Sequence, residues 1–125
     1  MLLPISHRFP KAHRLLTRGE FVAVQEEGHK VTSRFFVGLI QADAKQTHAR
    51  LGITATRRFG NAVARNRAKR IIREAFRTHR LQIPRGYRIV VLPRIALKRA
   101  TTDEAWADLE RLNVRIQRAL HNEAI

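Results

Sequence analysis

Apolar residues recur along the first half of the chain with two periods, and the change of period predicts where the elements lie. Thr17 and Glu20 have the spacing of a capping box, which predicts a short helix that Gly28 ends. Residues 35–40 form a short apolar run rich in aromatic side chains, and residues 49–55 alternate apolar with polar side chains. We expect both segments to be strands that pair as an antiparallel hairpin.

The second half of the chain predicts a long helix, a strand and a final helix. The long helix is expected over residues 61–80, and residues 87–92 have the apolar run of a strand. Thr101 and Glu104 form a second capping box, so the final helix begins there. Its apolar side chains recur every three or four residues, as on a helix that packs one side on a core.

We expect one domain over residues 1–125, since the sequence contains no internal repeat or linker and its length fits one core. An irregular basic arm is expected at about residues 1–16. Helices and strands in this order are typical of an α+β two-layer sandwich. No apolar run is long enough to span a bilayer, and the N-terminus lacks the pattern of a signal peptide, so we expect a cytoplasmic protein.

The charge of the chain narrows the class of partner. Lys and Arg number 25 against 10 Asp and Glu, a formal net charge of +15, and there is no cysteine. The absence of cysteine excludes disulfides, thiol catalysis and zinc sites built on cysteine. So much like charge repels itself, and a polyanion relieves the repulsion. Nucleic acid is the first candidate, with a membrane surface as the alternative.

Basic side chains are concentrated in residues 57–80, which hold nine Arg and Lys against one Glu. Arg65, Lys69, Arg73 and Arg77 are spaced four apart, so they form one stripe along the predicted helix. Like charges at this spacing destabilise a helix by about 0.2–0.5 kcal/mol per pair. The final helix, by contrast, mixes acids with arginines. The stripe is therefore predicted to face an anionic partner, in preference to a solvated face or a membrane-surface helix.

Several segments in order resemble one family. Residues 65–77, RNRAKRIIREAFR, resemble the RNR signature helix of the bacterial ribonuclease P protein. Residues 51–63, LGITATRRFGNAV, resemble the segment that precedes that helix, and residues 9–15, FPKAHRL, resemble the N-terminal motif. The resemblance covers roughly residues 9–120 without a large gap.

The resemblance implies a fold and a mechanism. The fold would be an α+β sandwich of three helices and about four strands in a mixed sheet, with a left-handed β-α-β crossover. Catalysis would belong to the RNA subunit, with magnesium bound mainly through that RNA. One protein would join one RNA and help it remove the 5′ leader of precursor tRNA. The protein would bind the leader between its first helix and the sheet, and favour magnesium and substrate binding.

Site residues follow position by position from the resemblance. The side chains expected to contact or flank the catalytic RNA are Arg57, Arg58, Arg65, Asn66, Arg67, Lys69, Arg70, Arg73 and Arg77. The candidates for the leader groove are Arg14, Phe21, Phe36 and Arg50. Core packing is the alternative role for both phenylalanines. The chain departs from the family at Gln25 and Leu39, where some members carry groove aromatics.

No catalytic constellation or metal site is expected in the chain itself. The carboxylates are scattered, and the six histidines show no metal-ligand spacing. Two alternatives stay open from the residues alone. A ribosomal or other structural RNA-binding protein would share the basic stripe, and a self-sufficient nuclease would cleave without RNA.

Overall fold

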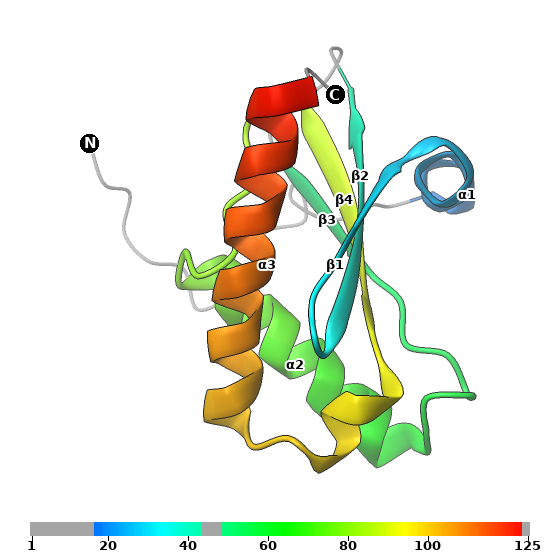
Figure 1. Cartoon of the computed structure of the whole chain (residues 1–125). Helices are drawn as coiled ribbons and strands as arrows, with labels where there is room; N and C mark the ends of the chain where they lie inside the picture. Colours follow the sequence, from blue (N-terminus) through cyan, green and yellow to red (C-terminus); the bar gives the residue numbers. More distant parts are fainter. Residues whose placement is uncertain (1–16, 44–48, 124–125) are drawn as a thin grey trace.

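The structure is a computed structural model that describes residues 17–43 and 49–123. In these residues an α+β fold is built from three α-helices, four strands and a short 3-10 helix (Figure 1). The elements are α1 (Arg18–Glu27), β1 (His29–Thr32), β2 (Phe36–Ala42), β3 (Arg50–Ile53), α2 (Ala62–Arg77), β4 (Tyr87–Pro93), η2 (Ile95–Arg99) and α3 (Thr102–Glu123). The predicted class, with a mixed sheet of four strands and three helices, is confirmed.

The sheet has the strand order β1-β2-β4-β3, and this order corrects the predicted hairpin. β4 lies between β2 and β3, antiparallel to β2 and parallel to β3, so Val91 pairs with Gly38 on one side and Ile53 on the other. The central place of β4 follows from its composition, since Ile89, Val90 and Val91 are all buried and a strand buried on both faces belongs inside a sheet.

β3, α2 and β4 form a β-α-β unit in which the two strands are adjacent and parallel. The left hand of this crossover stays a prediction. β1, which the periodicity did not predict, pairs antiparallel with β2 and forms one edge of the sheet. It is only four residues long, and Val31 is its one buried side chain. So short a segment shows too little alternation of apolar and polar residues to be predicted as a strand.

The two faces of the sheet have different covers (Figure 1). α2 and α3 cover one face and enclose the large core, which includes Phe36, Ile40 and Ile89. α1 lies against the opposite face on a much smaller apolar cluster, in which Val24 packs with Val90. Alternate residues of β4 therefore serve two separate cores, as the period of two in a strand requires.

The helix boundaries follow local capping chemistry. The capping box at Thr101 is confirmed, because the backbone N–H of Glu104 donates to Thr101 Oγ1 at 3.1 Å and that of Thr101 donates to Glu104 Oε1 at 2.9 Å. Thr17 is confirmed as the N-cap of α1, because the backbone N–H of Glu20 donates to its Oγ1 at 3.1 Å. α1 ends at Gly28, where an added Cβ would overlap the carbonyl oxygen of Val24. A side chain there would collide with the backbone.

α2 begins and ends within the predicted range. Asn61 is its N-cap, and its side chain accepts from the backbone N–H of Ala64 at 2.9 Å. The helix ends at Arg77, three residues before the predicted end. His79 has a φ of 65°, the left-handed conformation that commonly follows a helix end.

A buried carboxylate fixes the turn between β1 and β2. Asp108 of α3 is 1% exposed and accepts from Ser33 Oγ at 2.6 Å. It also accepts from the backbone N–H groups of Arg34 at 3.2 Å and Phe35 at 2.8 Å. The buried charge is thereby satisfied, and the turn is tied to α3.

Candidate nucleic-acid interface

α2 buries one side and exposes a basic one. Its buried side chains, which pack toward the sheet, are Ala68, Ile71, Ile72 and Ala75. Arg70 and Arg73 lie on the other side of the helix and are exposed. Arg65 and Lys69 lie on the flank between the buried and the exposed side and are half-buried. The helix therefore has the orientation that the sequence predicted, with its apolar side used by the core.

Most basic side chains of this surface have no acidic partner in residues 17–43 and 49–123. No ion pair or hydrogen bond to a carboxylate forms within that part of the chain for Arg57, Arg58, Arg65, Lys69, Arg70 and Arg73. We call these six side chains the α2 basic surface. Asn66, exposed on the same helix, adds an amide that can donate and accept.

Arg77, the last member of the predicted stripe, differs from the others. Its Nη2 lies 2.6 Å from Glu74 Oε2, and its Nε donates to Glu74 Oε1 at 3.2 Å. This hydrogen bond to the Glu74 carboxylate raises the pKa of Arg77. A phosphate would have to compete with Glu74 for this guanidinium, so Arg77 is a weaker candidate than the α2 basic surface.

Arg67 points toward η2. It donates to the carbonyl oxygens of Leu97 at 3.4 Å and Ala100 at 2.7 Å. These two carbonyls belong to η2 and its C-cap, so Arg67 ties α2 to the segment that leads into α3. The sequence did not indicate this structural role, because the partners lie about thirty residues away. A contact between Arg67 and RNA stays a prediction.

The loop between β3 and α2 carries Arg57 and Arg58, both exposed. Phe59 is 5% exposed and anchors this loop in the core. Arg58 and Phe59 also line a small cavity of about 120 Å³ that reaches Leu92 of β4. Leu92 belongs to the face of the sheet on which α1 lies, so the loop carries part of the α2 basic surface and also adjoins that face.

An ion-pair cluster ties α1 to the sheet. Arg50 Nη1 lies 2.5 Å from Glu20 Oε2, with the two side chains 9% and 18% exposed. Arg88 Nη1 lies 3.9 Å from the same oxygen and 3.5 Å from Asp43 Oδ2. Arg50 was predicted to line the leader groove. It does lie on the α1 side of the sheet, but its guanidinium is held by Glu20 and largely buried.

The predicted groove aromatics are separated by the sheet. Phe21 of α1 is half-buried and packs on the α1 side, next to Leu39 and Leu92. Phe36 is 0% exposed in the core under α2 and α3, so its assignment to the leader groove is wrong. The residue begins β2 and alternation turns it to the covered face. Arg14, the fourth candidate, lies outside the described residues.

Neither a metal cluster nor a membrane helix occurs in the described part of the chain. No group of three or more His, Asp and Glu side chains gathers there in a way that could hold a metal ion. None of its helices combines the length and the apolar character that crossing a bilayer requires.

Comparisons with known proteins agree with this architecture. The family model Ribonuclease P matches residues 9–117. A ribonuclease P protein component of Thermotoga petrophila is 36% identical over 109 residues, which cover 86% of this chain and 92% of that protein. One of Staphylococcus carnosus is 40% identical over 101 residues, which cover 80% and 86%.

Two solved structures share the fold. The RNase P protein of Staphylococcus aureus has a TM-score of 0.76 at 36% identity, covering 86% of this chain and 96% of that one. The RNase P protein of Thermotoga maritima has a TM-score of 0.69 at 34% identity, covering 83% and 96%. These matches, with the basic helix in its predicted place, decide the family. The chain belongs to the bacterial ribonuclease P protein family and acts with ribonuclease P RNA in processing the 5′ ends of tRNA.

Proposed function

We propose that the protein binds the catalytic RNA through the α2 basic surface and the precursor's 5′ leader on the α1 side of the sheet, and that the RNA carries out the chemistry. The observation that carries the proposal is the lack of acidic partners on the α2 basic surface in the described residues. The apolar side of α2 is already buried, so the side that remains for a partner is rich in cations. Arginine suits phosphate through its planar fork.

Arg65 adds a specific reason to expect an anionic ligand. Its Nε is buried and donates to no acceptor in the part of the chain that the structure describes. A buried N–H without an acceptor costs free energy, and this one belongs to a charged group. A phosphate oxygen or ribose hydroxyl of the RNA would satisfy it once the Arg65 side chain turns its Nε outward.

The α1 side of the sheet is suited to single-stranded RNA. Phe21, Leu39 and Leu92 give it a half-buried apolar surface, on which bases can stack or pack. Arg50 and Arg88 lie on the same side under the first turn of α1 and are held by Glu20. Glu20 and Asp43 balance the charge of these two arginines, so the cluster fixes α1 on the sheet, and the apolar side chains are the main contact proposed for the leader.

Magnesium enters the proposal through the RNA. Cleavage would use magnesium ions held mainly by the catalytic RNA. The protein would lower the magnesium concentration that is needed, because its cations neutralise phosphates that would otherwise repel one another. The proposed particle contains one protein and one RNA.

Reconstitution with the cognate RNA tests the proposal. Protein alone should leave precursor tRNA intact, and protein with RNA should cleave at lower magnesium than RNA alone. Arg65→Ala and Arg70→Ala should each lower the salt dependence of RNA binding by about one unit of slope. Cleavage by the protein alone, or an unchanged magnesium requirement, would contradict the division of roles.

A second comparison tests the leader surface. The reconstituted particle should bind precursor tRNA more tightly than mature tRNA, because only the precursor carries the single strand that meets the α1 side of the sheet. Equal affinities would remove that surface from the proposal and leave the α2 basic surface as a structural RNA contact alone.

A further inference from the structure

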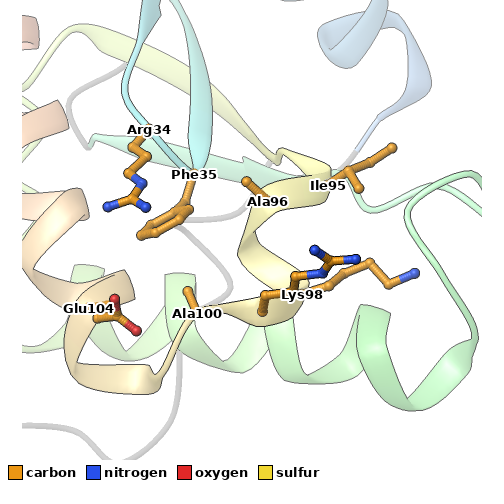
Figure 2. A pocket seen from close by; sticks show the side chains of 8 residues that line it. Arg34, Phe35, Ile95, Ala96, Lys98, Ala100 and Glu104 are labelled. Carbon is orange, nitrogen blue, oxygen red and sulfur yellow. The ribbon is translucent and has the colours of Figure 1, made fainter.

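A depression is lined by none of the side chains of the α2 basic surface or of the α1 side of the sheet (Figure 2). The turn between β1 and β2 forms one wall and η2 the other, with the start of α3 beside them. Its volume is about 450 Å³, within the range of about 300–1,000 Å³ that small-ligand sites occupy. None of the residues that line it was predicted to be functional.

The first wall offers a flat, cationic surface. The guanidinium carbon of Arg34 lies 5.0 Å from the centre of the Phe35 ring. Figure 2 shows both side chains on one side of the depression, with Ala96 of η2 on the other. A guanidinium plane backed by an aromatic ring is a surface on which a nucleobase can stack. The exposed Ala96 leaves room for such a base.

The second wall is basic. Lys98 and Arg99 of η2 line the depression and are exposed, which brings its cations to three with Arg34. Glu104 is the one acid of the lining, and its Oε1 already accepts from the backbone N–H of Thr101 at 2.9 Å. The balance of charge therefore favours an anionic ligand such as a phosphodiester.

The depression adjoins the start of α2. A Cβ placed on Gly60 would lie 3.5 Å from both Cε and Nζ of Lys98, so Lys98 packs against the residue before the N-cap of α2. Arg67 holds η2 to α2 through the carbonyls of Leu97 and Ala100. One RNA molecule that follows α2 can therefore continue onto Lys98 and Arg99.

Both walls are fixed before a ligand arrives. Asp108 holds the backbone of Arg34 and Phe35, and Arg67 holds the backbone of η2. A preorganised site loses little conformational freedom on binding, so even one nucleotide can contribute measurably to affinity.

We propose that this depression receives one unstacked nucleotide of the catalytic RNA, with its base against Arg34 and Ala96 and its flanking phosphates on Lys98 and Arg99. The inference rests on the proposed function, since it takes α2 as a contact of the catalytic RNA. Continuity with α2 favours this RNA over an acidic peptide, which would meet the cations but would have no need of the stacking surface.

Site-directed cross-linking locates the nucleotide. The chain has no cysteine, so Ala96→Cys creates a unique thiol for a photoreactive azidophenacyl group. The matched control is Val114→Cys, at a position 48% exposed on α3 and away from the depression. In the reconstituted particle, the catalytic RNA and the precursor tRNA carry different labels. The Ala96→Cys variant should cross-link to a single-stranded position of the catalytic RNA in a much higher yield than the control variant. Cross-linking to precursor tRNA alone, or at the control level, overturns the proposal.

Binding measurements separate bulk from charge. Ala96→Trp fills the depression without changing charge and should weaken RNA binding about 5- to 150-fold, the range of one lost base stack, at unchanged salt slope. Lys98→Ala with Arg99→Ala should lower the slope by about one unit per lost phosphate contact. The matched control is Arg85→Ala with Arg118→Ala, two exposed arginines elsewhere, which should leave the slope unchanged.

The outcomes for this site and for the proposed function are distinct. Circular dichroism first establishes that each variant is folded. The nucleotide site is overturned if the Ala96→Trp variant and the Lys98→Ala, Arg99→Ala variant both bind RNA as the unaltered protein does. This conclusion does not depend on how Arg65→Ala changes RNA binding. Unchanged binding by Arg65→Ala and Arg70→Ala counts instead against the α2 basic surface.

Discussion

Replacing Arg67 separates a structural role from a role in binding RNA. Arg67→Ala removes two hydrogen bonds from a charged donor, at 2.7 Å to Ala100 and at 3.4 Å to Leu97. A hydrogen bond that involves a charged group contributes about 1.5–3 kcal/mol, and the longer of these two is weaker than that range. The aliphatic stem of Arg67 is half-buried and adds packing that alanine cannot replace. We expect the free energy of unfolding to fall by about 2 kcal/mol.

The assay for Arg67 is urea unfolding followed by the helical circular dichroism signal, with the slope against urea compared between variants. Arg70→Ala is the matched control, since Arg70 is exposed on the same helix and has no acidic partner in residues 17–43 and 49–123. It should change stability by no more than about 0.5 kcal/mol. Toward RNA, Arg70→Ala should lower the salt slope by about one unit, and the slope of folded Arg67→Ala shows whether Arg67 also contacts a phosphate. Equal stability of the two variants would refute the structural role of Arg67.

Three further predictions concern carboxylates. Glu20→Ala removes the carboxylate that joins α1 to Arg50, so the free energy of unfolding should fall by about 2 kcal/mol. The particle should also lose its preference for precursor over mature tRNA, whereas an unchanged preference would separate α1 from leader binding. Asp108→Ala leaves the backbone donors of the β1–β2 turn without their acceptor. The free energy of unfolding in urea should fall by about 3 kcal/mol, and a fall below about 1 kcal/mol would count against this role of Asp108. The hydrogen bond from the backbone N–H of Thr101 lowers the pKa of Glu104 below 4.5, with a smaller contribution from Arg34. The ionised Glu104 carboxylate therefore stabilises the folded protein above pH 4.5, and this stabilisation is lost as the pH falls through the lowered pKa. Glu104→Gln should accordingly show a smaller loss of stability between pH 7 and pH 3 than the unaltered protein, and an equal loss would contradict this origin.

Local signals in the sequence predicted most of the elements. The capping boxes at Thr17 and Thr101 placed the starts of two helices, and the apolar positions of α2 gave its buried side correctly. These features depend on residues three or four apart, whose interactions a sequence displays directly. The basic side of α2 followed from the same geometry.

Features that depend on residues far apart in the sequence could not be predicted from local patterns. A period of two shows that residues 35–40 and 49–55 are strands but says nothing of which strand pairs with which, so the insertion of β4 between them was missed. The roles of Arg67 and Arg50 depend on partners about thirty residues away. Phe36 was assigned to the groove by position in the family pattern, and burial under α3 removes it.

The salt dependence of binding between the protein and its catalytic RNA tests the central claim most directly. In our proposal the α2 basic surface contacts phosphates of the RNA. Each lost contact should therefore remove about one unit from the slope of log K against log salt. The triple variant Arg65→Ala, Lys69→Ala and Arg73→Ala should therefore bind with a slope lower by about three units, while folding as the unaltered protein does. A folded triple variant with an unchanged slope would contradict the account.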